Sequence, residues 1–345
     1  MIVQAELTNA PSTDATSVYR WRDGLYAVDL LTCAIVHLDF FTWLAEGERS
    51  TAEICGHFQI AERPTDVMLT LFVAMDYLRR VRGDVVELTD VAREHLVRSS
   101  PFYLGPYYAS LKDRPVCKDF LEVLRTDKPA NWGSFKNEKD WARAMEGETF
   151  AQNFTAAMDC RGVLLGQALA EKVDLTGRKR LLDVAGGSGI YACAIAARWK
   201  ELTAAVYEKG PVTKVAEEAI RKRGFSERVK VICGDMFKEE LPGGFDVHLI
   251  SNVLHDWNEK MVRELLEKSY AALESGGLLV VHDVHINEEK TGPLPNAAYS
   301  ALLMNVTEGK CYSLSELYPM LREVGFREMR FTETAADRSI VTALK

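Results

Sequence analysis

Residues 251–260, SNVLHDWNEK, place a histidine directly after an apolar run. An imidazole titrates near neutral pH, so His255 has the side chain best suited to move a proton there. The preceding residues, FDVHLISNVL, have the length and composition of a buried strand. If that strand ends beside a ligand crevice, His255 is a candidate general base. If it ends in a plain surface loop, the histidine has no such role, and the neighbouring elements decide between the two.

A second stretch, LLDVAGGSGIY, combines an acid with small residues. Its apolar part predicts a buried strand that ends near Asp183, followed by a loop that opens a helix. Glycine lets the backbone approach a ligand closely at a helix N-terminus. In open α/β sheets the ligand crevice lies beyond the carboxyl ends of the strands. We therefore expect a cofactor site that includes Asp183 and the loop residues Ala185, Gly186 and Gly187.

Two further acids follow the next two predicted strands. Glu208 ends LTAAVYE, where a carboxylate can accept both hydroxyls of a ribose. Asp235, in CGDMF, can take an adenine amino group, with Met236 and Phe237 packing against the ring. Together with Asp183, these residues predict an adenosine site.

The loop favours one kind of nucleotide cofactor. A dinucleotide site prefers G-x-G-x-x-G, but GGSGIY has Tyr191 at the last glycine position and offers no strong pyrophosphate cradle. An acid-rich site suits a cofactor that has no phosphate and one positive charge. S-adenosylmethionine, with its sulfonium, fits this description.

The second half of the chain alternates between strands and helices. Such alternation, with helices of 10 to 15 residues, indicates a doubly wound parallel sheet covered on both faces. Near the end, EMRFTET and SIVTALK flank the turn-like AADR and predict a closing hairpin with an antiparallel edge. The strands are expected at 178–186, 202–208, 229–235, 245–253 and 277–286, and the helices at 188–200, 212–224 and 259–276. The strand before His255 should then lie next to the first strand, which places the imidazole over the cofactor crevice.

The first half reads as helices. Helical spacing of apolar residues covers 34–47 and 65–81, and a short β-rich pair around Gly83 leads to a helix that Thr89 can cap. Helix, helix, strand pair and helix is the pattern of a winged helix-turn-helix. One alternative is therefore a regulator that senses S-adenosylmethionine and binds DNA, although only RRVR provides a local basic cluster.

Composition narrows the class of protein. The chain has 345 residues, which suggests two domains, and a net charge of −8, which argues against a nucleic-acid partner. No apolar run reaches the roughly 20 residues that span a membrane, and the N-terminus does not resemble a signal peptide. We expect a cytoplasmic protein with reduced cysteines.

At this point the chain resembles the class I S-adenosylmethionine-dependent O-methyltransferases of the plant caffeate and bacterial antibiotic or acetylserotonin type. The shared motifs are LLDVAGGSG, GDMF, VLHDW and LREVGF, in that order. The resemblance implies a winged-helix dimerisation domain at 1–100, a helical linker at 101–170 and a Rossmann-like domain at 171–345. It also implies a homodimer, His255 as the base that deprotonates an acceptor hydroxyl, and Trp257 as a wall of the cofactor site.

Some positions depart from that family's pattern. Asp283 and Cys311 stand where relatives carry glutamates that flank the base, and Ser251 replaces a lysine that contacts the cofactor. A thiol cannot replace a carboxylate unless it ionises. These changes leave open an N- or C-methyltransferase, or an enzyme that keeps the cofactor for another reaction.

The acceptor is expected to be a small, flat and mostly apolar molecule. Its predicted pocket draws on the mid-chain helices and on the segment before Cys311, and the candidates are Phe154, Met158, Met304, Asn305 and Cys311. A metal is not expected. One alternative remains, because His255, Asp283 and His285 form a set of two histidines and a carboxylate that can hold non-haem iron.

Overall fold

The computed structural model describes residues 7–130 and 148–345, and of residues 148–154 it describes the backbone only. The contacts divide the chain into two compact units. The C-terminal unit comprises Met1–Ser17, Glu138–His285 and Glu316–Lys345, and the N-terminal unit comprises Val18–Asn137 and Ile286–Ser315. Residues 286–315 thus group with the N-terminal unit, whereas the expected domain boundaries include them in the Rossmann-like domain at 171–345.

A seven-stranded sheet forms the centre of the C-terminal unit, in the order β5-β4-β3-β6-β7-β9-β8. The strands are β3 (Arg180–Val184), β4 (Thr203–Glu208), β5 (Val229–Cys233), β6 (Phe245–Ser251), β7 (Leu273–Asp283), β8 (Arg327–Glu333) and β9 (Ser339–Leu344). The first five run parallel, and β9 pairs antiparallel with both β7 and β8. The predicted α/β class, the parallel sheet and the closing hairpin are confirmed.

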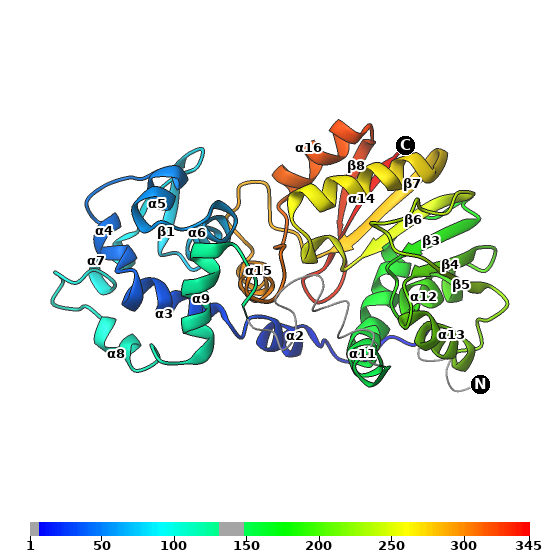
Figure 1. Ribbon diagram of the computed structural model, residues 1–345, viewed down its shortest axis with the longest axis horizontal. Coiled ribbons are helices and arrows are strands. Elements are labelled where there is room, and N and C mark those ends of the chain that lie inside the picture. Colours follow the sequence, from blue (N-terminus) through cyan, green and yellow to red (C-terminus); the bar gives the residue numbers. More distant parts are fainter. Residues whose placement is uncertain (1–6, 131–147) are drawn as a thin grey trace. The chain divides into compact units, whose positions relative to one another are not determined.

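Helices cover both faces of this sheet (Figure 1). On one face lie α11 (Glu148–Lys172), α12 (Ile190–Arg198) and α13 (Val212–Lys222), and on the other lie α14 (Glu259–Ala272) and α16 (Leu314–Val324). A Cβ at Gly162 would lie 2.3 Å from the Ile190 side chain, so α11 approaches α12 at a distance that only glycine permits there. Helix α14 ends four residues earlier than predicted, because β7 already begins at Leu273.

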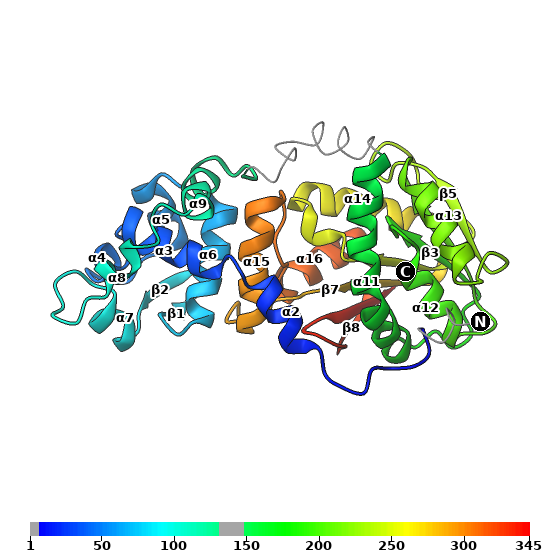
Figure 2. The same ribbon diagram turned by 90° about the horizontal axis from the view of Figure 1, so that it is seen from below.

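The N-terminal unit contains α3 (Ala27–Thr32), α4 (Phe40–Leu44), α5 (Thr51–Phe58), α6 (Glu62–Ala74), β1 (Leu78–Arg82), β2 (Val85–Leu88), α7 (Asp90–His95), α8 (Gly105–Ala109), α9 (Pro115–Thr126) and α15 (Leu294–Val306), and most of α2 (Thr16–Asp23). The predicted order of helix, helix, strand pair and helix is present in α5 to α7, and the Thr89 hydroxyl accepts from the Ala92 amide as expected. Helix α15 packs against α6 and α9 (Figure 2).

Two helix predictions in this unit were wrong in extent. The helix expected over 34–47 is interrupted at Asp39, which has a left-handed backbone with φ 53°. The helix expected over 65–81 ends at Ala74, and RRVR lies in strand β1 instead. Among the described residues, no helix combines the length and the apolar character needed to cross a membrane.

Candidate active site

The loop after β3 is shaped by a buried acid. Asp183 is fully buried, and neither of its carboxyl oxygens has a hydrogen-bond partner of standard geometry. Burial raises the pKa of Asp183 to about 7, against a partial opposing effect from the Ala192 amide. A Cβ at Gly186 would lie 2.5 Å from the Asp183 carboxyl carbon, so only glycine fits there. Asp183 therefore supports the loop from below and does not face a ligand directly.

Ala185 and Gly187, on either side of Gly186, both adopt positive φ, at 54° and 56°. The left-handed conformation costs a residue with a side chain roughly 1–2 kcal/mol, so Ala185 is strained. Its amide donates to the Tyr207 carbonyl over 2.8 Å, which holds the loop against the end of β4. The loop thus turns sharply at the carboxyl end of β3, as a cofactor site requires.

Glu208 lies at the carboxyl end of β4, next to this loop. Its carboxylate accepts from the amides of Gly187, at 3.1 Å, and Lys209, at 2.9 Å. Burial raises the pKa of Glu208, and these two amides oppose that shift. The carboxylate therefore lies beside the glycine loop, where a ribose would bind.

Asp235 follows β5, the next strand along the sheet. Burial alone would raise the pKa of Asp235, but the Phe237 amide and the Lys238 ammonium hold it below its ordinary value. The rings of Phe237 and Trp257 meet edge to face, with centroids 4.7 Å apart, and Met236 beside them is half-buried. A carboxylate and a pair of contacting aromatic rings thus lie close together after β5.

Under the end of β6 lies a buried polar network. The Ser251 hydroxyl is 2.9 Å from Nδ1 of His282, and the Asn252 amide donates to both Ser251 and the Tyr191 hydroxyl over 3.0 Å. Sequence reasoning did not identify Asn252 or assign a role to Tyr191, and nothing in the motif indicates that these residues meet. Oδ1 of Asn252 is buried without a hydrogen-bond partner.

His255 lies in a short helical turn, Leu254–Asp256, directly after β6. Its Nδ1–H donates to Oδ1 of Asp283, the last residue of β7, and that oxygen also accepts from the Val284 amide over 2.8 Å. Because β6 and β7 are parallel neighbours, their carboxyl ends bring the two side chains together. A hydrogen bond at Nδ1 places the lone pair on Nε2, which is the form that accepts a proton.

The C-terminal unit contains four buried histidines: His248, His255, His282 and His285. Burial lowers the pKa of His248 and of His282 to about 3, and that of His285 to about 4. Burial alone would also lower the pKa of His255, but Asp283 and Asp256 outweigh it, so the pKa of His255 is raised. Burial would raise the pKa of Asp283, and His255 lowers it in turn. Of these four, His255 is the one whose environment suits proton transfer near neutral pH.

Asp256 adds a second carboxylate, which sequence reasoning missed. Its Oδ1 lies 3.6 Å from Nε2 of His255, and its side chain is 44% exposed. The motif holds no signal of this contact, because side chains one residue apart on a helical turn do not as a rule face each other.

The alternative of a metal site finds no support in the described part of the chain, where no group of three ligand side chains is placed to hold a metal ion. His285 instead uses Nδ1 to contact the Ser339 hydroxyl of β9, at 2.8 Å.

The predicted acceptor residues fall in both units. Met158 is a half-exposed residue of α11, and Phe154 belongs to the same helix but its side chain lies outside the described residues. Met304 and Asn305 are buried in α15, and Cys311 is buried near them, its amide donating to the Ser300 hydroxyl over 3.1 Å. Their role in acceptor binding stays a prediction.

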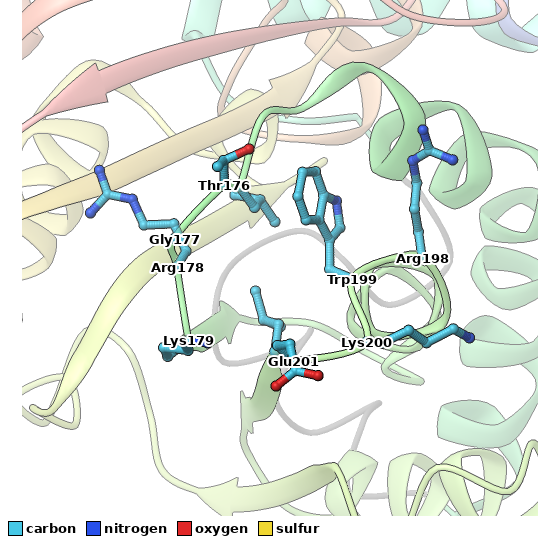
Figure 3. Close-up of a pocket in the computed structure, with 10 residues that line it drawn as sticks. Thr176, Gly177, Arg178, Lys179, Arg198, Trp199, Lys200 and Glu201 are labelled. Carbon is cyan, nitrogen blue, oxygen red and sulfur yellow. The ribbon is translucent and has the colours of Figure 1, made fainter.

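A hollow of about 270 Å³ lies at the amino ends of the inner strands β3 and β4. Residues 175–179 and 198–202 line it, with Trp199 among them (Figure 3). The indole nitrogen of Trp199 donates to the Ala170 carbonyl over 3.3 Å. This hollow is at the amino ends of the strands and so is separate from the site at their carboxyl ends.

The strand ends fit an adenosine cofactor. Glu208 and Asp235 are carboxylate acceptors of the kind that ribose hydroxyls and an adenine amino group need, and a Cβ at Gly187, beside Glu208, would meet no protein atom within 4 Å. The buried, unpartnered Oδ1 of Asn252 is a further acceptor at the end of β6.

Comparisons with known proteins identify the family. Residues 123–327 match the O-methyltransferase domain. The chain is 31% identical over 317 residues to 3-hydroxy-5-methyl-1-naphthoate 3-O-methyltransferase of Streptomyces sahachiroi, covering 91% of this chain and 90% of that protein. It is 27% identical over 339 residues to acetylserotonin O-methyltransferase of Bos taurus, covering 93% and 95%.

Among solved structures, the chain is similar to an O-methyltransferase family 2 protein of Planctomyces limnophilus in complex with apigenin. The TM-score is 0.86 at 29% identity, and the match covers 98% of both chains. The domain match and the naphthoate relative together establish that this chain belongs to the O-methyltransferase domain family and is a methyltransferase.

Proposed function

We propose that this enzyme methylates a hydroxyl group on a small aromatic acceptor, with His255 as the general base. The observation that carries the proposal is the hydrogen bond between Nδ1 of His255 and Asp283 at the carboxyl ends of β6 and β7. It distinguishes His255, whose pKa is raised, from His248, His282 and His285, whose pKa values burial lowers. In this proposal Asp283, although its side chain is one carbon shorter than the family's glutamate, reaches Nδ1 of His255 and orients the ring.

The chemistry follows from this pairing. When bound, S-adenosylmethionine supplies a methyl group on a positively charged sulfur. Nε2 of His255 accepts the proton of the acceptor hydroxyl, so that the oxygen becomes a stronger nucleophile. Asp283 stabilises the imidazolium that forms and fixes the orientation of the ring, and Asp256 adds negative charge near Nε2.

The cofactor's adenosine would be held by the three strand ends. Glu208 accepts from the ribose hydroxyls, Asp235 accepts from the adenine amino group, and Phe237 with Trp257 forms an apolar wall. Ala185, Gly186 and Gly187 provide the backbone beneath it. Ser251, where relatives carry lysine, contacts His282 and contributes indirectly through Asn252.

Two relatives support an aromatic acceptor. One is named for the 3-O-methylation of 3-hydroxy-5-methyl-1-naphthoate, and the other is bound to apigenin. The buried apolar residues around Met304 agree with a mostly apolar acceptor pocket.

An acceptor screen with methyl-labelled S-adenosylmethionine tests the proposal. We expect label on the oxygen of an aromatic hydroxyl, located by mass spectrometry and NMR of the product. Label on carbon or nitrogen with the true acceptor would overturn the O-specific part, and loss of a group without methyl transfer would indicate a repurposed enzyme.

We also propose a homodimer formed through the first helices. Val18, Trp21, Leu25 and Val28 are exposed apolar residues of α2, α3 and their connection, and Trp21 is 85% exposed. Isolated apolar side chains are common on surfaces, but a cluster of this kind marks an interface. Light scattering should give the mass of a dimer, and Trp21→Glu should shift it toward that of a monomer. A monomeric wild type would contradict this.

The DNA-binding alternative loses its main support. Arg79 of the RRVR cluster pairs with Glu87 at 2.8 Å, and Arg82 lies 3.5 Å from Glu48. These partners neutralise part of the positive charge that contact with phosphates requires.

A further inference from the structure

We propose that Lys268 of α14 is a positioning residue that fixes the adenine-binding loop, residues 235–239, and thereby sets affinity and base selectivity for the cofactor. The inference rests on the proposed adenosine site. It adds a residue on the outer helix layer that no motif identifies.

The side-chain ammonium of Lys268 meets the loop from beneath. Nζ donates to the carbonyls of Phe237, at 2.6 Å, and of Met236 and Glu239, each at 3.2 Å. The side chain is only 15% exposed, and its Nζ lies 3.4 Å from Oε1 of Glu264 on the same helix. Three carbonyls from four consecutive residues therefore converge on one cation.

An ammonium suits this task because it has three donors and no acceptor. Its hydrogen bonds are charge-assisted, so they are stronger than neutral ones. An uncharged side chain of similar length would leave three carbonyls without this donor, and the loop would lose its preferred shape.

The loop's shape determines where the recognition groups lie. The Asp235 carbonyl accepts from the amides of Lys238 and Glu239, and the Asp235 carboxylate accepts from the Phe237 amide. Phe237 in turn contacts Trp257 through its ring. By fixing the backbone at residues 236–239, Lys268 holds the carboxylate and the aromatic wall in one arrangement, which is what discrimination of a purine requires.

The test compares Lys268→Met with Lys260→Met, an exposed lysine of the same helix. Calorimetry with S-adenosylhomocysteine and with its inosine analogue, which lacks the adenine amino group, measures affinity and base selectivity. We expect Lys268→Met to weaken binding of the adenine form about tenfold and to narrow the ratio between the two forms. The KM for S-adenosylmethionine should rise, with the acceptor KM and the saturated kcat changed less than about twofold. Lys260→Met should behave as wild type.

Two further variants separate the possible outcomes. Lys268→Gln keeps a hydrogen-bond donor, so its cofactor affinity and base selectivity should lie between those of wild type and of Lys268→Met. If Lys268→Met does not fold, Lys268→Gln takes its place in the test. Asp235→Asn tests the adenosine site itself. If Asp235→Asn weakens binding but neither Lys268 variant does, the role of Lys268 is refuted and the site stands. If none of these variants alters binding or selectivity, the adenosine site is wrong as well.

Discussion

His255, in the turn that follows β6, and Asp283, the last residue of the neighbouring parallel strand β7, meet at the carboxyl ends of these strands. The imidazole Nδ1–H donates to Oδ1 of Asp283, and the same oxygen accepts from the Val284 amide. A catalytic base needs a fixed tautomer and a pKa near the working pH, and this arrangement supplies both. The carboxylate counteracts the effect of burial on His255, an effect that lowers the pKa of His248, His282 and His285.

Replacing Asp283 should change the pH dependence of the reaction. Only neutral His255 accepts a proton, so the wild-type rate should rise with pH through a pKa above the ordinary 6.5. Asp283→Asn removes the charge that raises this pKa, so burial should move the midpoint to lower pH. The plateau rate should also fall, by roughly 10²- to 10⁴-fold, because the ring loses its orientation. Initial rates from about pH 5.5 to 9 measure both effects, and an unchanged midpoint would count against the pairing.

The tight contact beneath the glycine loop predicts a difference between neighbouring glycines. Gly186→Ala would place a methyl group 2.5 Å from the Asp183 carboxyl carbon, so the loop must shift and cofactor affinity should drop by about tenfold or more. Gly187→Ala meets open space and should cost only the left-handed strain, about 1–2 kcal/mol of unfolding free energy. Calorimetry with S-adenosylhomocysteine and thermal unfolding distinguish the two. Wild-type affinity in Gly186→Ala would refute the role assigned to Gly186.

In the N-terminal unit, one acid ties the segment around α15 to α6. Asp66 contacts Lys290 at 2.9 Å and Lys310 at 2.5 Å. Burial would raise the pKa of Asp66, but the two lysines lower it to about 2. Asp66→Asn leaves both lysines without this partner and should reduce the unfolding free energy on the order of 3 kcal/mol at neutral pH.

The pH dependence of that loss has a definite sign. The folded pKa of Asp66 is depressed, so its contribution is present above the unfolded value of 3.8 and is lost as pH falls through about 2. Urea unfolding should show that the difference in unfolding free energy between wild type and Asp66→Asn disappears over this pH range. Glu62→Gln, an exposed change on the same helix, is the control and should show no gap at any pH.

Much of the C-terminal unit was predictable because its strands are short, mostly apolar runs, with a polar residue at or soon after the end, such as Glu208 for β4 and Asp235 after β5. Asp283 was identified from the family's glutamate position, and the expected order of the strands places it beside the strand that precedes His255. The end of α6 was not predictable in this way, since Leu78 and Val81 continue an apolar spacing that helices and strands share.

Contacts made through the backbone left no signal in the sequence. Lys268 binds three carbonyls, and any residue type can supply a carbonyl, so no motif records the contact. Asp183 is a different case. It was predicted as a cofactor contact because it ends the first strand, but it faces inward beneath Gly186 and acts through the loop.

The most direct test of the account measures the rate of methyl transfer by His255→Ala on the acceptor found in the screen, alongside its affinity for S-adenosylhomocysteine. The account predicts a kcat lower by about 10²- to 10⁴-fold, with cofactor affinity within about twofold of wild type. A variant that keeps the full rate on that acceptor would contradict the assignment of His255 as the base.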